Sequence, residues 1–98
     1  MYTVVFHPGA EQDFLEAYLW YEERSPGLGD RFSRLVERQI KLVSENPEHY
    51  PKKKAQYRES KTDIFPYLIV YKVYPDTGIV FIVSVYHTSR KPGKKYRK

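Results

Sequence analysis

The feature that most constrains the fold is a change in hydrophobic period near the middle of the chain. Up to about residue 46, apolar side chains recur every three or four positions, a spacing that predicts amphipathic helices. From residue 64 onward they come in dense β-branched and aromatic runs, which favour strands. Helices and strands that are segregated in this way are typical of an α+β domain.

Two helices are expected in the first half. The first starts at Pro8, whose missing N–H suits a first helical turn, and stops near Arg24, because Ser25 precedes a proline. The second starts at either Ser25-Pro26 or Asp30 and stops at Asn46-Pro47. The apolar stripes are Ala10, Phe14, Ala17, Tyr18 and Tyr21 in the first helix and Phe32, Leu35, Val36, Ile40 and Val43 in the second. The short link between the helices predicts an antiparallel hairpin.

Four segments have the composition of strands. They are residues 2–6, 56–61, 64–74 and 79–86. Residues 56–61 alternate only weakly, which predicts an edge or half-exposed strand. Pro75-Asp76-Thr77-Gly78 joins the last two runs and has turn chemistry, so these runs predict a β-hairpin. The expected architecture is therefore an N-terminal strand and an antiparallel helical hairpin packed on one face of a mostly antiparallel β-sheet.

Charge is unevenly distributed along the 98 residues, which have the length of one domain, 1–98. Up to Glu48 there are nine acidic and five basic residues, a net −4, and from His49 onward there are three acidic and twelve basic residues, a net +9. Residues 52–54 are lysines in an expected connector, and residues 88–98 form a basic C-terminal tail that we expect to be mobile. The basic half predicts an anionic partner, either nucleic acid or an acidic protein.

Composition argues against several kinds of site. The absence of cysteine excludes disulfides, thiolate metal sites and a cysteine nucleophile. The three histidines, His7, His49 and His87, lie in separate segments without a helical ligand spacing, so we expect neither a metal nor another cofactor. The sequence shows no N-terminal signal and no apolar run of about 20 residues, so we expect a soluble, cytoplasmic protein without membrane contacts.

Six local matches, taken with the order of the elements, resemble the RelE/ParE toxin superfamily. They are the opening Tyr2-Thr-Val-Val-Phe-His-Pro-Gly-Ala-Glu-Gln-Asp-Phe14, Tyr18 and Tyr21 close to a charged helix end, Asn46-Pro47 after the second helix, Arg58 on the third element, Phe65-Pro-Tyr-Leu-Ile-Val-Tyr71 on the central strand, and Val85-Tyr-His-Thr-Ser-Arg-Lys-Pro92 near the end. The resemblance covers nearly the whole chain. It implies the RelE/ParE fold and a growth-inhibiting toxin that is held silent, in a hetero-oligomer, by a co-encoded and usually acidic antitoxin.

The resemblance leaves three functions open. ParE-like members poison DNA gyrase, and we favour this interpretation because His87-x-x-Arg90-x-Pro92 matches their ending and no apolar pattern supports Tyr96. RelE-like members cut mRNA within the ribosome without a metal ion. The third function is that of a domain that has lost toxicity and only binds an antitoxin or operator DNA.

The resemblance also implies where the functional residues lie. In a RelE-like RNase the catalytic residues would be Arg58, His87 and Arg90, and we expect these three to converge at the far end of the sheet. The expected target- or phosphate-binding residues are Lys52, Lys53, Lys54, Arg58, Arg90 and Lys91. Trp20 and Tyr50 are the expected antitoxin contacts, because large aromatic side chains are frequent interface anchors.

Overall fold

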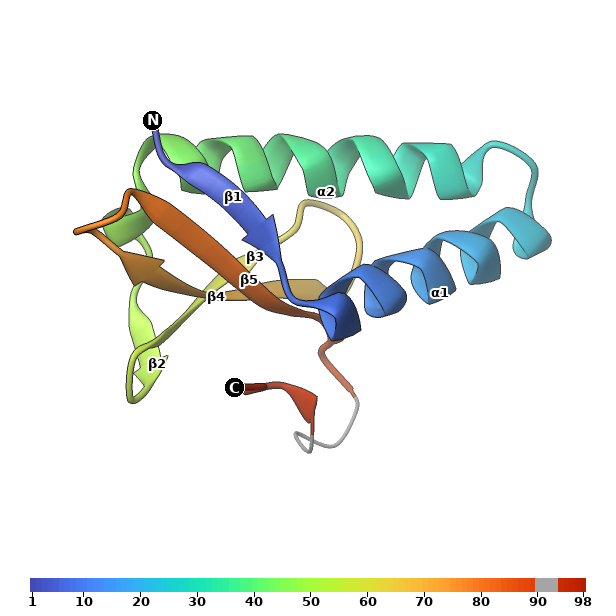
Figure 1. Ribbon diagram of the computed structural model, residues 1–98. Helices are drawn as coiled ribbons and strands as arrows, with labels where there is room; N and C mark the ends of the chain where they lie inside the picture. Colours follow the sequence, from blue (N-terminus) through green and yellow to red (C-terminus); the bar gives the residue numbers. More distant parts are fainter. Residues whose placement is uncertain (90–93) are drawn as a thin grey trace.

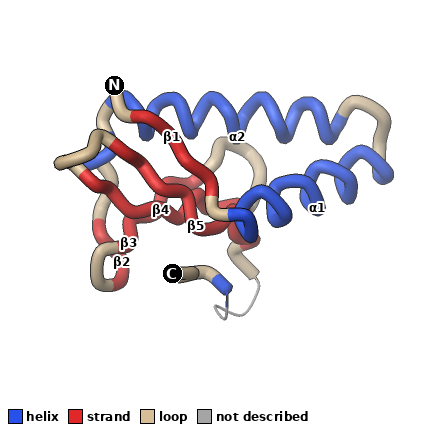
Figure 2. The backbone as a smooth tube through the Cα atoms, viewed as in Figure 1, coloured by secondary structure: helices blue, strands red, loops and turns tan. Residues whose placement is uncertain are grey.

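Two helices lie side by side over one face of a five-stranded sheet in the computed structural model, which describes residues 1–89 and 94–98 (Figure 1). The elements are β1 (Thr3–Phe6), α1 (Pro8–Arg24), α2 (Leu28–Glu45), the short 3-10 helix η1 (Pro47–His49), β2 (Lys52–Lys54), β3 (Tyr57–Lys61), β4 (Tyr67–Tyr74) and β5 (Ile79–His87). Figure 2 shows the same separation of helices from strands. The predicted α+β class, with a helical hairpin on a sheet, is confirmed.

The sheet has the strand order β1-β5-β4-β3-β2. The N-terminal strand β1 runs parallel to β5, and the other three pairings are antiparallel. The prediction of a mostly antiparallel sheet is therefore confirmed. β4 and β5 form the predicted hairpin at the centre, and β1 is an edge strand.

The turn between the two helices is held by the Glu22 carboxylate, and the N-cap residue of α2 makes no side-chain hydrogen bond. α1 ends at Arg24 as predicted, whereas α2 begins at Leu28, between the two predicted starts. Gly27 precedes α2 with a φ of 90°, a conformation that glycine adopts without strain. The Glu22 carboxylate accepts hydrogen bonds from the backbone N–H groups of Gly27 at 2.8 Å and Gly29 at 2.9 Å. These bonds satisfy donors that a helix start otherwise leaves unpaired.

Apolar side chains form two clusters, one on each face of the sheet. The larger cluster, between helices and sheet, contains Ala10, Ala17, Tyr21, Phe32, Val36, Val43, Phe65, Tyr67, Ile69, Tyr71, Val80, Ile82 and Val85. The smaller cluster contains Val70, Val83 and Tyr86, with Tyr57, Leu68, Phe81 and Tyr96 packed against them. Because neighbouring strand residues point to opposite faces, this second cluster marks the face away from the helices, called the open face below.

Three details of the strands differ from the sequence-based expectation. The lysines of residues 52–54, predicted as a connector, form the edge strand β2 by pairing with β3. Of the two alternatives predicted for residues 56–61, the edge strand is wrong, since β3 lies between β2 and β4, whereas the half-exposed strand agrees with the partial burial of Tyr57, Arg58 and Glu59. β4 begins at Tyr67 rather than at Ile64, because Ile64 has a φ of 69° and Pro66 has no N–H to donate to a ladder.

The mobility predicted for the C-terminal tail is wrong for residues 94–98. These residues lie on the open face, and Figure 1 places the C-terminus beneath the sheet, opposite the helices. The predicted basic tail of residues 88–98 also includes positions 90–93, which lie outside the described residues.

Candidate functional site

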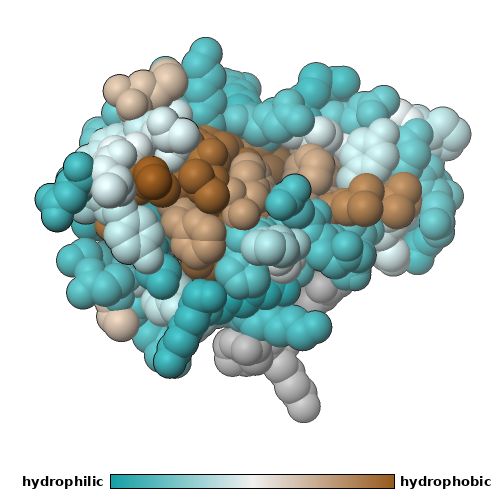
Figure 3. Space-filling model, viewed as in Figure 1, coloured by the Kyte–Doolittle hydropathy of each residue, from teal (hydrophilic) through white to brown (hydrophobic). Residues whose placement is uncertain are grey.

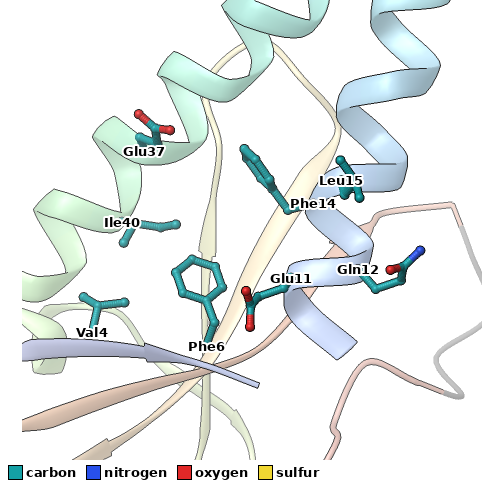
Figure 4. A pocket seen from close by; sticks show the side chains of 8 residues that line it. All are labelled: Val4, Phe6, Glu11, Gln12, Phe14, Leu15, Glu37 and Ile40. Carbon is teal, nitrogen blue, oxygen red and sulfur yellow. The ribbon is translucent and has the colours of Figure 1, made fainter. Parts of the chain in front are cut away.

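An apolar groove opens between β1 and the two helices (Figure 4). Its volume is about 590 Å³, and its lining residues are Val4, Phe6, Glu11, Gln12, Phe14, Leu15, Glu37 and Ile40. Figure 3 shows hydrophobic residues gathered in the space framed by β1, α1 and α2. Leu15 is 48% exposed, although apolar side chains of this size are more often buried. A concave surface of this kind is suited to receive apolar side chains of a protein partner.

Local structure explains how the sequence builds this groove. β1 alternates its side chains, so Val4 and Phe6 both face the helices, where they pack against the larger cluster. Phe14 on α1 lies 5.8 Å from Phe32 on α2, ring centre to ring centre, and packs against the larger cluster. In the described ranges 1–89 and 94–98, β1 pairs with β5 alone, so its outer edge is open to an added strand.

The two aromatic residues predicted as antitoxin contacts do not lie together. Trp20 is 50% exposed on α1, with the Arg24 guanidinium 4.0 Å above its ring. Tyr50 is half-buried beyond the far end of α2, and its hydroxyl accepts a hydrogen bond of 3.0 Å from the Gln39 amide. Trp20 lies near the turn that precedes α2, and Tyr50 lies beyond the other end of α2. The 18 residues of α2 span about 27 Å at about 1.5 Å per residue, so the two aromatic side chains are about that far apart. Neither residue lines the apolar groove.

Arg58 is half-buried, donates hydrogen bonds to backbone carbonyls, and borders a small pocket of about 140 Å³ together with Lys52. It pairs with Tyr71 in the β3–β4 ladder, which places its side chain on the helix-covered face. Its Nη1 donates to the carbonyl oxygen of Tyr50 at 2.5 Å and, more weakly, to that of Glu48 at 3.3 Å. Burial raises the pKa of the neighbouring Tyr71 phenol, and the charge of Arg58 partly opposes this rise. Arg58 therefore fixes the connection between η1 and β2.

His87 lies at the other end of the sheet. It pairs with Tyr67, and its Nδ1 accepts a hydrogen bond of 3.1 Å from the backbone N–H of Ser89. It borders a second cavity of about 600 Å³, lined by Glu16, Ala17, Trp20, Tyr21, Pro66, Tyr67, His87 and Ser89.

The structure does not bring Arg58 and His87 together. Their partners on β4, Tyr71 and Tyr67, are four residues apart, or about 13 Å along a strand. The convergence expected of these two residues is therefore wrong, because antiparallel register fixes them at different ends. The predicted residues Arg90 and Lys91 lie outside the described residues.

A polar cluster on the open face was missed by sequence reasoning. The Tyr96 hydroxyl donates to Glu59 at 2.5 Å, and Lys95 lies 3.1 Å from the same carboxylate. Tyr57 packs against Tyr96 at 5.0 Å between ring centres and donates its hydroxyl to the carbonyl oxygen of Arg97 at 2.9 Å. Burial and the hydrogen bond to Glu59 raise the pKa of Tyr96. The expectation that nothing apolar supports Tyr96 is wrong, since it packs on the open-face cluster.

The predicted lysines of residues 52–54 lie exposed along β2. The Lys54 ammonium lies 5.2 Å from the centre of the Tyr96 ring, which brings this strand next to the polar cluster of the open face. Over residues 1–89 and 94–98, no group of three histidine, cysteine, aspartate or glutamate side chains is placed to hold a metal ion. No helix in that part of the chain is both long and apolar enough to cross a membrane.

The fold is that of a small α+β protein, with a helical hairpin packed on one face of a mixed five-stranded sheet. A family model described as the ParE toxin of the type II toxin–antitoxin system parDE matches residues 4–92. The chain therefore belongs to this family and is a type II toxin of the ParE-like kind. A search of curated proteins finds no match.

Solved toxin–antitoxin structures share the fold at low sequence identity. The chromosomal ParDE system from P. aeruginosa matches with a TM-score of 0.78 and 14% identity over 91% of this chain and 98% of that one. The intact E. coli RelBE toxin-antitoxin complex matches with a TM-score of 0.70 and 20% identity over 92% of this chain and 100% of that one. The isolated E. coli RelE toxin matches with a TM-score of 0.68 and 20% identity over 93% and 88%.

Proposed function

We propose that this toxin acts in the cytoplasm by inhibiting DNA gyrase and that a cognate antitoxin silences it by occupying the apolar groove. The proposal of gyrase inhibition rests on the match of the ParE family model to residues 4–92, nearly the whole chain. The proposed position of the antitoxin rests on the groove, because it is an open apolar surface beside the edge strand β1.

The geometry of the predicted catalytic residues favours inhibition by binding over RNA cleavage. Metal-independent cleavage requires a base, an acid and a cation within hydrogen-bond reach of one phosphate. Arg58 is engaged with two backbone carbonyls, and His87 lies at the opposite end of β4. Arg58 and His87 therefore do not form one acid–base centre, which supports a toxin that acts by binding a protein target.

A gyrase assay tests the target. Purified toxin is added to gyrase, relaxed plasmid and ATP, and supercoiling and trapped cleavage complexes are measured on agarose gels. In parallel, the toxin is added to a translating bacterial extract and the length of the mRNA is followed. The proposal expects blocked or trapped gyrase and intact mRNA. Shortened mRNA together with unaffected gyrase would contradict it and favour a ribosome-dependent RNase.

A matched pair of exposed leucines tests the antitoxin position. Leu15 lines the groove and is 48% exposed, while Leu42 is 44% exposed and lies away from it. A charge in an apolar interface is costly to desolvate, so Leu15→Asp should weaken antitoxin binding about tenfold or more. Leu42→Asp should leave binding nearly unchanged. Calorimetry with the product of the neighbouring antitoxin gene measures both, and equal affinities for the two variants would place the antitoxin elsewhere.

The antitoxin's charge follows from the surroundings of the groove. Glu11 and Glu37 line the groove, whereas the lysines of β2 lie on the opposite edge of the sheet. A partner that only placed acidic side chains at the groove would meet like charges. We therefore expect an apolar antitoxin segment in the groove and an acidic segment that reaches the basic edge, with an affinity that falls as salt rises.

A further inference from the structure

The connection between β3 and β4 holds an isoleucine in a strained backbone conformation. Ile64 has a φ of 69°, in the left-handed region, which a β-branched residue rarely adopts and which glycine and asparagine adopt more readily. Ala55 also has a positive φ, but it lies in the two-residue turn between β2 and β3, a kind of turn that requires it. Connections as long as residues 62–66 are most often built around a type I turn, whose central residues have negative φ.

Hydrogen bonds on both sides of Ile64 impose this conformation. The hydroxyl of the buried Thr62 lies 3.0 Å from the carbonyl oxygens of both Phe65 and Tyr67, to which it donates. The backbone N–H of Phe65 donates across Ile64 to the carbonyl oxygen of Asp63 at 2.7 Å. Strained conformations persist where the surrounding structure over-determines them, and they concentrate at binding and catalytic sites.

The strained residue is also exposed. The side chain of Ile64 is 63% exposed and belongs to neither apolar cluster of the fold. A glycine or an asparagine at this position would relieve the strain without removing a core contact. An apolar contact with a partner protein accounts for an isoleucine that the packing of the chain itself does not need.

A recess lies next to Ile64, between α2 and the start of the connection. Figure 1 shows this connection, in yellow, rising from the sheet toward α2. The volume of the recess is about 330 Å³, and its lining residues are Leu35, Arg38, Gln39, Leu42, Lys61, Thr62 and Asp63. The recess shares no lining residue with the apolar groove, and the two lie on different sides of α2. Ile64 and the recess together are called the Ile64 surface below.

The charge of the Ile64 surface is mainly positive. Arg38 and Lys61 line the recess and are exposed, and Asp63 is the acidic residue beside them. In the ranges 1–89 and 94–98, the two ion pairs within 4.0 Å involve neither of these cations. A complementary partner surface therefore has an apolar pocket with acidic side chains around it.

We propose that this toxin holds gyrase at the Ile64 surface, with Ile64 inserted into an apolar pocket of gyrase and with Arg38 and Lys61 facing acidic side chains. This inference rests on the proposed inhibition of gyrase and adds the position of the contact. A few side chains that fill pockets of the partner contribute most of the binding free energy in many interfaces. The hydrogen bonds around Ile64 fix its backbone before gyrase binds, which lowers the entropy lost on binding.

The position agrees with silencing by an antitoxin in the apolar groove. The groove and the Ile64 surface are separated by α2, and a helix with its side chains is about 10–12 Å across. An antitoxin seated in the groove therefore lies within one helix diameter of the target contact. Its bulk obstructs the approach of a large protein without covering Ile64.

Supercoiling by purified gyrase, measured with the full chain at increasing toxin concentrations, tests the contact. Ile64→Asn removes the apolar side chain, and asparagine tolerates the positive φ. Half-maximal inhibition should require about tenfold more toxin or a higher excess, the lower range for burial of one such side chain. The urea midpoint of this variant should stay equal or rise, because the backbone strain is relieved. A lower midpoint would contradict the strain at Ile64.

Two further variants serve as controls for Ile64→Asn. Ile64→Val keeps the β-branched apolar side chain and loses one methylene, so it should weaken inhibition about fourfold at most. Leu19→Gln alters another exposed leucine-sized side chain, 48% exposed on α1, which lines neither the groove nor the recess. It should inhibit gyrase like the unaltered chain.

The basic residues are tested by the salt dependence of inhibition. Arg38→Ala/Lys61→Ala should weaken inhibition and make it less sensitive to salt, because opposite charges across an interface are screened by ions. Arg31→Ala/Lys41→Ala removes the same charge from two exposed residues of α2 that do not line the recess. This matched double variant should behave nearly like the unaltered chain.

Three outcomes would overturn the position while leaving the proposed function intact. They are equal inhibition by the unaltered chain and Ile64→Asn, equal weakening by Ile64→Asn and Leu19→Gln, and a loss of antitoxin binding in Ile64→Asn with gyrase inhibition retained. Calorimetry with the antitoxin measures the last of these, which would assign the Ile64 surface to the antitoxin. An unaltered chain that leaves gyrase active would instead overturn the proposed function and this inference together.

Discussion

Arg97 and Asp13, which are 84 positions apart in the chain, form a bidentate ion pair. The Nη1–Oδ2 distance is 2.5 Å and the Nη2–Oδ1 distance is 2.9 Å. The same Nη1 donates to the carbonyl oxygen of Val83 at 3.0 Å, and the same carboxylate accepts from the N–H of Val85 at 3.1 Å. The ion pair therefore anchors the C-terminal residues both to α1, through Asp13, and to β5, through Val83 and Val85.

Removing the charge of Asp13 should loosen this fastening. Both side chains are largely buried, with exposed fractions of 15% for Arg97 and 16% for Asp13. Hydrogen bonds to charged groups contribute about 1.5–3 kcal/mol, so Asp13→Asn should lower the free energy of unfolding by about that amount. Urea denaturation measures the loss. Glu23→Gln, at an exposed position of the same helix, is the control and should change stability little. Equal losses for the two variants would mean that the pair does not hold the tail.

The same pair explains why the docked tail was not predicted. In sequence, Lys95, Tyr96 and Arg97 are polar residues near a terminus and have no hydrophobic period. Their partners, Asp13 and Glu59, lie 84 and about 37 positions away, and no local pattern connects them. Helix ends and the β4–β5 hairpin were predictable because caps, prolines and alternation act within a few residues.

The strand β2 and the role of Arg58 also could not be predicted from local sequence. Three consecutive lysines have a low tendency to form a strand, and only their pairing with β3 makes them one. Arg58 was expected to be a phosphate ligand from its position alone, whereas its side-chain direction depends on the register between β3 and β4. Register is a long-range property, so the strand was predictable and the role of its arginine was not.

Gly29→Ala should destabilise the chain although alanine is the better helix former. Alanine favours an exposed helix interior by about 1 kcal/mol over glycine. At Gly29, however, a Cβ atom would lie 2.7 Å from the carbonyl oxygen of Tyr18, where α1 and α2 approach each other. Separating the helices should cost more than the gain, and we expect a net loss of about 1–3 kcal/mol in urea denaturation. Ser33→Ala, further along α2, should be nearly neutral, and a stabilised Gly29→Ala variant would contradict the close approach.

Tyr71→Phe should reduce the sensitivity of the fold to alkaline pH. Burial raises the pKa of this phenol above its value in the unfolded chain, about 10. A group with a raised folded pKa contributes stability that is complete below the unfolded pKa and is lost as pH rises through the folded one. Phenylalanine does not ionise, so the free energy of unfolding should fall less steeply above about pH 10 in the variant. At neutral pH the variant should be about 1 kcal/mol less stable, because the hydroxyl donates to the Pro47 carbonyl oxygen at 2.7 Å. Identical alkaline slopes would refute the assignment.

Arg58→Ala separates a structural arginine from a target-binding one. The contacts of Arg58 with the carbonyl oxygens of Tyr50 and Glu48 predict that its loss lowers the free energy of unfolding by about 1–3 kcal/mol. Arg58→Lys keeps the charge but not the planar fork of donors, so its loss should be intermediate. Growth arrest should weaken only as far as the folded fraction falls. If Arg58→Ala abolished growth arrest while its unfolding curve stayed unchanged, Arg58 would contact the target directly, and the backbone carbonyls would not be its main partners in the active toxin.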